Sequence, residues 1–331
     1  MTIRFAKVLK MLGAEIFLYG HSQNDAPCDE LIPVILEGER AALIGQTPYQ
    51  AVKLAPEEPL FTLTNPRIAV EIGKRKQRGD LICTIGGASQ EAATTPHPDL
   101  MVVEYSIGYV GCFSPYRIYQ SHAWRHVSYG YQHIATGRFF DDVIPGFCEV
   151  EPFQDRYTPG HDYLCYVGRL TKLKGIGVAC DAARLTGLPL KIVGHGDPSL
   201  ITYGEFLGGL PDAQRNEVMG GALALLAPTL YLEPYGFISP EAQLAGTPVI
   251  STDWGGFVET VEHGLTGYRC TMLGEFTDAI SKVGTLDRCY IRQRARALYS
   301  METAALAYGR FFARLGTLWE KGWPTVPWPL A

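Results

Sequence analysis

An α/β fold with two doubly wound domains is predicted from three features of the 331-residue sequence. The second half alternates short apolar runs with helical segments, which is typical of a parallel sheet covered by helices on both faces. A content of 47% hydrophobic and 19% charged residues can supply large cores. The length suits two domains of ordinary size. A linker near residues 145–152 gives predicted domains of 1–148 and 149–331.

Apolar runs in the second half are predicted to form the strands of one sheet, at residues 163–167, 190–193, 205–207, 222–226 and 247–251. The helices expected among them are residues 175–186, 211–219, 237–245 and 257–261. Pro211 suits a first helical turn, where the N–H that proline lacks has no partner anyway. In such a sheet a ligand binds beyond the carboxyl ends of the strands, where helix N-termini also point.

Two basic residues flank the turn after the first of these strands. Gly168 and Arg169 follow the strand, and Lys174 comes directly before the next helix. Both cations can converge on an anion that also meets the positive end of that helix. For this motif alone, a turn with two solvated bases is the favoured alternative.

Two carboxylates, Glu233 and Glu241, stand eight positions apart around the turn at Gly236. Glu233 lies in the loop after a strand, and Glu241 in the opening turns of the following helix. They can hydrogen-bond two different polyols, a hexose and a ribose. The alternative is a pair of acids that stabilise a helix start. With the basic turn before it and the glycine pair 255–256 after it, this order of motifs favours a nucleotide-sugar site.

Residues 162–270 resemble the donor-binding domain of the family-four retaining glycosyltransferases of the GT-B fold, also called glycosyl transferases group 1. The hallmark of that family is a Glu, seven residues, Glu element, here Glu233 to Glu241. The resemblance implies a fold of two Rossmann-like domains that face a cleft. It also implies that Arg169 and Lys174 hold the donor diphosphate. The other residues implied on the donor side are Gly168, Gly194, Gly209, Leu210, Gly236, Phe237 and Ile238.

The activity implied by this resemblance is transfer of a sugar from a UDP- or GDP-sugar to a glycan, lipid or small-molecule acceptor. Glu233 is expected to position the sugar rather than attack it. We expect no cofactor and no metal, because Asp141 and Asp142 lie in a predicted linker and form no DxD site. The alternatives are an inactive nucleotide-sugar-binding module and another GT-B enzyme, such as a sugar-nucleotide epimerase or a phosphorylase.

Candidates on the acceptor side come from the first domain. His122 and His126 are four residues apart and share a face if the segment is helical. A general base is one role for them, and a packed or solvated pair is the favoured alternative. Glu104 ends a predicted strand, 100–104, and is a further candidate.

The opening of the chain departs from the family pattern. Residues 1–12 have the apolar spacing of a helix, and residues 15–19 that of a strand. The family's first domain begins instead with a strand and a glycine-rich turn. We therefore expect an N-terminal domain without its first strand, with a gap in its sheet or a rearranged sheet edge. The long helical stretch 287–320 is expected to cross back and brace this domain.

Composition limits the partners and the compartment. A net charge of −5 gives no general attraction for nucleic acid, and the basic run 74–78 is expected to be a solvated loop. The eight cysteines form no CxxC pair, which favours thiols in a reducing, cytoplasmic compartment. No apolar run reaches the roughly 20 residues needed to span a bilayer. The helix at residues 1–12 either packs on the sheet, which is favoured, or makes a peripheral contact with an anionic membrane.

Overall fold

The computed structural model describes residues 1–45, 52–153 and 162–321, which divide into two compact units. The C-terminal unit comprises Gln120–Ile134 and Pro145–Thr303, and the N-terminal unit comprises Met1–Tyr119, Ala135–Ile144 and residues 304–321, each within the described ranges. The C-terminal unit therefore includes residues 120–134 and 145–148, which lie before the single boundary placed after residue 148. Residues 120–134 belong with the C-terminal unit, and the last helix belongs mostly with the N-terminal unit, as a chain that crosses back does.

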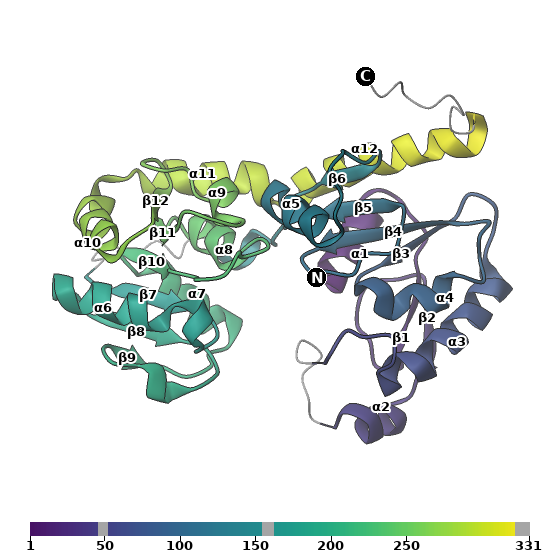
Figure 1. The fold of residues 1–331 in the computed structure, drawn as a ribbon, viewed down its shortest axis with the longest axis horizontal. Coiled ribbons are helices and arrows are strands. Elements are labelled where there is room, and N and C mark those ends of the chain that lie inside the picture. The colour runs from purple at the N-terminus through teal and green to yellow at the C-terminus, as the bar shows by residue number, and fades with distance from the viewer. Residues whose placement is uncertain (46–51, 154–161, 322–331) are drawn as a thin grey trace. The chain divides into compact units, whose positions relative to one another are not determined.

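The C-terminal unit is built on a six-stranded parallel sheet (Figure 1) with the order β12-β11-β10-β7-β8-β9. The bounds of its strands are β7 Leu164–Val167, β8 Leu190–Val193, β9 Glu205–Phe206, β10 Ala224–Ala227, β11 Val249–Thr252 and β12 Gly267–Cys270. Leu164 and Tyr166 point into one apolar cluster, and Cys165 between them points into the other. This alternation shows that the sheet is buried on both faces, as parallel sheets usually are.

Helices cover both faces of this sheet. The helices of the C-terminal unit are α5 His122–Tyr131, α6 Ile176–Thr186, α7 Asp212–Gly220, α8 Ile238–Leu244, α9 Phe257–Thr260, α10 Leu273–Lys282 and α11 Arg288–Tyr299. The expected helical stretch 287–320 is broken at Ser300, which is extended and separates α11 from α12 (Met301–Lys321). At this break the N–H of Cys148 donates to the Tyr299 carbonyl at 2.8 Å. A parallel β-bridge between Cys148 and Ser300 therefore interrupts the helical stretch.

The N-terminal unit contains two separate parallel sheets. One pairs β1 (Phe17–His21) with β2 (Glu30–Ile35). The other has the order β3-β4-β5-β6, with bounds Leu81–Thr84, Met101–Ile107, Tyr116–Tyr119 and Asp141–Val143. The helices are α1 Thr2–Met11, α2 Glu37–Ile44, α3 Pro59–Arg75 and α4 Glu91–Thr94. The opening helix and the strand after it agree with the sequence pattern, whereas β2 and α3 were not predicted.

A gap separates the two sheets of the N-terminal unit, as the sequence led us to expect. Among the described residues, β1 pairs only with β2, and β3 pairs only with β4. Two cavities of about 250 and 390 Å³ lie between them and are lined by residues of β1 and β3, with α1 and α3 contributing apolar side chains. Two strand edges therefore face a space instead of a neighbouring strand.

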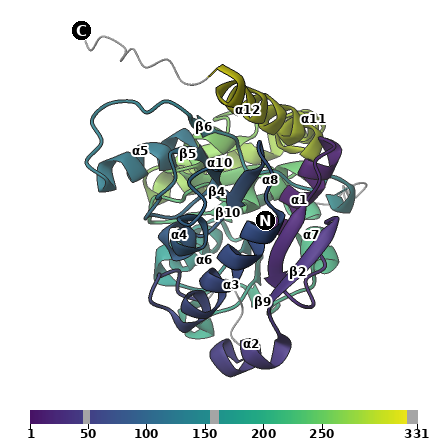
Figure 2. The same cartoon turned by 90° about the vertical axis from the view of Figure 1, so that its right-hand side faces the viewer.

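The opening helix α1 packs inside the N-terminal unit (Figure 2). The Phe5 ring stacks on Tyr105 at a centroid distance of 3.8 Å and meets the edge of Tyr308, on α12, at 5.0 Å. This helix therefore packs on the sheet through Phe5, while Ile3 and Met11 on the same helix are exposed. In the described part of the chain no helix is long and apolar enough to span a membrane.

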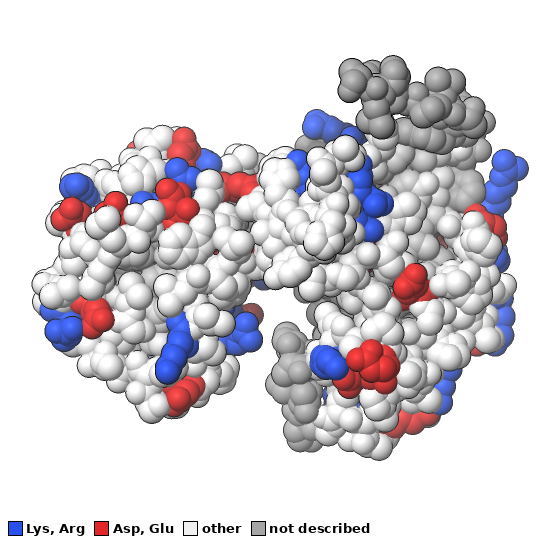
Figure 3. Space-filling view, in the orientation of Figure 1, with Lys and Arg blue, Asp and Glu red and all other residues white. Residues whose placement is uncertain are grey.

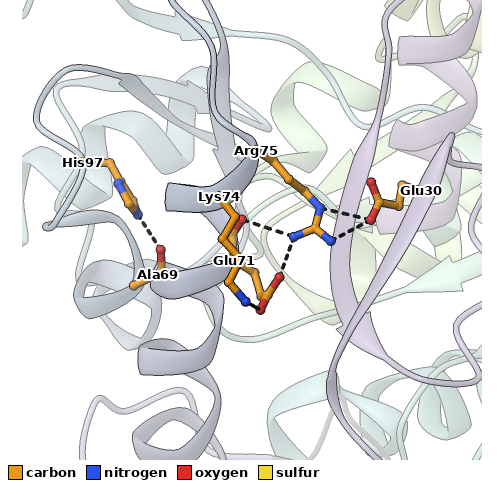
Figure 4. A network of polar contacts seen from close by, with 6 residues as sticks. All are labelled: Glu30, Ala69, Glu71, Lys74, Arg75 and His97. Carbon is orange, nitrogen blue, oxygen red and sulfur yellow. Dashed lines mark hydrogen bonds and ion pairs between the residues drawn. The ribbon is translucent and has the colours of Figure 1, made fainter.

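The basic run 74–78 is partly helical and is paired with acids. Lys74 and Arg75 end α3. Lys74 contacts Glu71 at 2.5 Å, and Arg75 contacts Glu30, on β2, at 2.7 Å (Figure 4). On the face drawn in Figure 3, basic and acidic side chains are interspersed over both units. The run is therefore a surface ion-pair network that ties α3 to β2, not a solvated loop.

Candidate functional site

The loop that follows β7 carries Arg169 and Lys174, two of the predicted site residues, and its backbone is hydrogen-bonded to Tyr166. The buried Tyr166 hydroxyl donates to the Arg169 carbonyl at 2.9 Å and to the Lys174 carbonyl at 3.4 Å. Gly175, at φ +74°, ends the loop, and a Cβ there would lie 1.8 Å from the Pro228 carbonyl oxygen. Only glycine allows this approach. The loop after β7 is therefore packed directly against the loop after β10.

The loop after β10 brings Glu233 to the same place. The Leu230 N–H donates to the Leu173 carbonyl at 2.8 Å, which joins the two loops. Behind them, the Trp254 indole N–H donates to the Thr229 carbonyl at 3.0 Å. The Glu233 carbonyl accepts from the Gly256 N–H at 2.7 Å. The sequence predicted that these loops meet at the carboxyl edge of the sheet, and the structure places them in contact.

Lys174 and Glu233 form an ion pair at the centre of this arrangement. The distance from Lys174 Nζ to Glu233 Oε2 is 2.5 Å, and the two side chains are 21% and 11% exposed. The Tyr231 hydroxyl donates to the same Oε2 at 2.8 Å. The Lys174 ammonium also lies 5.0 Å from the centroid of the Tyr231 ring, within the range of a cation–π contact. We call Arg169, Lys174, Tyr231 and Glu233 the loop cluster.

The charges of the loop cluster act on Tyr231. Burial raises the pKa of the Tyr231 hydroxyl, and the Glu233 carboxylate adds to this effect. The exposed Arg169 guanidinium acts in the opposite direction on the same pKa. The hydroxyl is therefore a proton donor to Glu233 across the whole neutral range. Tyr231 was missed by the sequence reasoning, and its only signal is its place two residues before Glu233.

Glu241 lies in a different set of contacts from Glu233. It is buried in the first turn of α8, and its Oε2 lies 3.5 Å from Nη2 of Arg215 on α7. Gly236, at φ +77°, makes the turn before α8, and a Cβ there would lie 2.6 Å from the Phe257 ring. Phe237 and Ile238 then begin the helix. The two acids of the predicted motif thus each have a basic partner, and Arg215 was not predicted.

Three glycines expected on the donor side lie where the loops after β7, β8 and β9 meet. The Gly168 N–H donates to the Val193 carbonyl at 3.0 Å, and the Gly194 N–H donates to the Gly208 carbonyl at 2.9 Å. A Cβ on Gly209 would lie 1.9 Å from the His195 ring. The structure therefore brings Gly168, Gly194 and Gly209, with the adjacent Leu210, to one edge of the sheet and adds His195 beside them.

The two histidine candidates belong to the C-terminal unit, not to the N-terminal domain where we expected them. The carboxylate of Glu259, on α9, accepts from the N–H groups of His122 and Ala123 at 2.9 and 2.8 Å. The Ser121 hydroxyl donates to the Pro234 carbonyl at 2.6 Å. These bonds hold the first turn of α5 next to the residue after Glu233. His122 and His126 themselves are exposed.

Glu104 is fully buried in β4 and holds a loop of the N-terminal unit. Its Oε2 accepts from the N–H groups of Phe113 and Ser114, both at 2.9 Å, and Tyr109 donates to Oε1 at 3.3 Å. Burial raises the pKa of the carboxyl group, and the two backbone N–H groups oppose that rise. These contacts are those of a structural residue, since the carboxylate is turned into the protein.

Similarity in sequence to known proteins is found in the second half of the chain. The profile of the family described as Glycosyl transferases group 1 matches residues 161–285. The D-inositol 3-phosphate glycosyltransferase of Rhodococcus erythropolis is 36% identical over 131 residues, which is 33% of this chain and 30% of that protein. The chain therefore matches only about a third of the length of this curated relative.

Solved structures extend the fold match to almost the whole chain. AviGT4, a glycosyltransferase involved in avilamycin A biosynthesis, is 20% identical with a TM-score of 0.67, covering 95% of this chain and 88% of its own. HepE of Anabaena, solved in complex with UDP and glucose, is 15% identical with a TM-score of 0.66, and the match covers 95% of both chains. At these identities the likeness establishes the fold.

Proposed function

Because residues 161–285 match the glycosyl transferases group 1 family and the chain has the GT-B fold, we propose that it is a retaining glycosyltransferase. It transfers a sugar from a UDP- or GDP-sugar to a glycan, lipid or small-molecule acceptor. The observation that carries this proposal is the loop cluster, in which two cations and one carboxylate meet at the carboxyl edge of the sheet. An anionic group and a polyol are the ligands that such a set binds.

The cations of the loop cluster hold the donor diphosphate. Arg169 is exposed, and Lys174 needs only to exchange its Glu233 partner for a phosphate oxygen. Negative charge develops on the leaving diphosphate as the bond to the sugar breaks, and fixed cations stabilise that charge without reorganisation. The two side chains supply this charge without a metal ion.

Glu233 positions the sugar, and Glu241 binds the ribose of the donor. The bond between the sugar and the diphosphate breaks while a bond to the acceptor oxygen forms on the same face of the sugar. The acceptor proton passes to an oxygen of the leaving diphosphate, so no protein nucleophile is needed. Holding both reactants in this geometry is the main task left to the protein.

Thermal unfolding in the presence of nucleotides tests this function. Purified protein in EDTA is titrated with UDP, GDP, ADP and their sugar conjugates. A ligand that binds only the folded state raises the unfolding temperature by mass action. HepE was solved with UDP and glucose, so the UDP series is the first to test. We expect a rise with one nucleotide class that is lost in Arg169→Ala and kept in Lys172→Ala, a neighbouring exposed lysine.

Turnover distinguishes a transferase from the other functions open to this fold. We expect Glu233→Ala and Arg169→Ala to lower transfer by about a hundredfold, the loss typical of an orienting or charge-stabilising contact. Glu205→Ala, at an exposed acid on β9, is the control. Binding without transfer to any acceptor would indicate an inactive binding module. Conversion of the sugar nucleotide without an acceptor would indicate an epimerase.

A further inference from the structure

The Glu233 carboxylate is bound asymmetrically. Lys174 Nζ at 2.5 Å and the Tyr231 hydroxyl at 2.8 Å both reach Oε2. Among the described residues, no hydrogen bond or ion pair reaches Oε1 of Glu233. A carboxylate has about four acceptor positions on its two oxygens. One oxygen is therefore used by the protein, and the other is left to accept from a ligand.

Tyr231 contributes to this asymmetry in two ways. Its hydroxyl remains bonded to Glu233 when a ligand draws Lys174 away, because hydroxyl and ammonium are separate donors. Its ring lies 5.0 Å from Lys174 Nζ, and so gives the ammonium an attractive surface besides the carboxylate. A side chain that contacts both members of the ion pair can hold each of them while the other is engaged.

The position of Tyr231 is itself fixed by the backbone around it. The preceding residue, Leu230, is bonded to Leu173 of the facing loop at 2.8 Å. Thr229 accepts at its carbonyl from Thr252 at 2.8 Å and from Trp254 at 3.0 Å. Tyr231 is therefore carried on a segment tied to both neighbouring strand ends, which suits a residue that sets the orientation of another.

We propose that Tyr231 is a positioning residue of the donor site, which fixes the Glu233 carboxylate through Oε2 and keeps Oε1 for a hydroxyl of the donor sugar. This inference rests on the proposed function. It separates two parts of donor recognition. The diphosphate depends on Arg169 and Lys174, whereas the sugar depends on Glu233 held by Tyr231.

Binding of UDP and of UDP-sugar to the same variants tests this separation. Tyr231→Phe keeps the ring and removes the hydroxyl. We expect it to leave the UDP dissociation constant within about twofold and to weaken UDP-sugar about tenfold, in the range for one hydrogen bond to a charged group. Tyr231→Leu also removes the ring, and we expect it to weaken UDP as well.

The chain offers a matched control in Tyr163. The centroid of the Tyr163 ring lies 3.8 Å from Lys191 Nζ, and the Tyr163 hydroxyl donates to the Val218 carbonyl at 3.0 Å. Tyr163→Phe thus removes a hydroxyl from another tyrosine–lysine pair of the same unit, and we expect it to leave both dissociation constants unchanged. An equal loss of UDP and UDP-sugar binding in Tyr231→Phe, or no loss of either, would overturn the proposed role.

A second measurement needs no donor. The coupling between Tyr231→Phe and Glu233→Gln in the free energy of unfolding reports their contact directly, and we expect the double variant to be more stable than the two single losses predict. Additive losses would contradict the contact. Wild-type protein that binds neither nucleotides nor sugar nucleotides, while this coupling is present, would refute the proposed function and leave the contact intact.

Discussion

The Lys174–Glu233 ion pair makes a specific prediction for Lys174→Met and Glu233→Gln, alone and together. Exposed pairs contribute about 0–1 kcal/mol, and loss of one partner from a fully buried pair costs about 3–5 kcal/mol. This pair lies between those limits, because its side chains are 21% and 11% exposed. We expect Lys174→Met to lower the free energy of unfolding by about 2 kcal/mol.

The double variant isolates the interaction between the two side chains. Once Lys174 has been replaced, Glu233→Gln removes a largely buried carboxylate that has lost its cation, so the cost of this second substitution falls. We expect a coupling energy of about 1 kcal/mol from urea unfolding of the four proteins. Additivity within about 0.3 kcal/mol would show that the ion pair contributes nothing measurable and would refute this reasoning.

Binding of UDP to the same variants provides a second test of the ion pair. Lys174→Met removes a cation from the diphosphate site, and we expect UDP to bind about 30-fold more weakly, which corresponds to about 2 kcal/mol. Glu233→Gln releases Lys174 from its ion pair, so UDP is expected to bind as tightly as in the wild type or more tightly. Calorimetric titration measures both. Weaker UDP binding in Glu233→Gln would contradict the competition between carboxylate and phosphate.

Three further results are expected. Gly175→Ala should prevent folding of the C-terminal unit or lower its stability by more than about 3 kcal/mol, since a Cβ would lie 1.8 Å from the Pro228 carbonyl oxygen at φ +74°; a variant with native circular dichroism and unfolding temperature would contradict this. Ser121→Ala should cost about 1 kcal/mol in urea unfolding, because it removes the N-cap of α5; the wild-type midpoint would show that the cap is dispensable. Arg67 holds the pKa of Glu39 at about 2, below its value of 4.5 in the unfolded chain. The stability that this ion pair contributes is therefore complete above pH 4.5 and is lost as the pH falls towards 2. Glu39→Gln should make the free energy of unfolding less dependent on pH in that window, and an unchanged pH dependence would refute the assignment.

Much of the C-terminal unit follows from its sequence because local pattern and tertiary structure agree there. The strand predicted at 190–193 is β8 to the residue, and the loops that carry Arg169, Lys174 and Glu233 do follow strands. Parallel strands with their carboxyl ends at one edge bring such loops together whatever the details of the packing. The presence of a site at that edge was therefore predictable.

The partners within the site were not predictable, because they depend on contacts between distant residues. Nothing near Glu241 in the sequence indicates Arg215 on α7, and a lone tyrosine before Glu233 has no periodicity to mark it. The histidines of α5 were assigned to the first domain by their position along the chain. The hydrogen bonds from the His122 backbone N–H to Glu259 and from the Ser121 hydroxyl to Pro234 place that helix with the C-terminal unit instead.

A crystal structure of the protein with the nucleotide that most raises its unfolding temperature tests the central claim most directly. We predict that the diphosphate lies within hydrogen-bond distance of Lys174 Nζ and the Arg169 guanidinium, with the Lys174–Glu233 distance longer than the 2.5 Å of the free protein. A nucleotide bound in the cavities between β1 and β3, with the Lys174–Glu233 pair intact, would contradict the account.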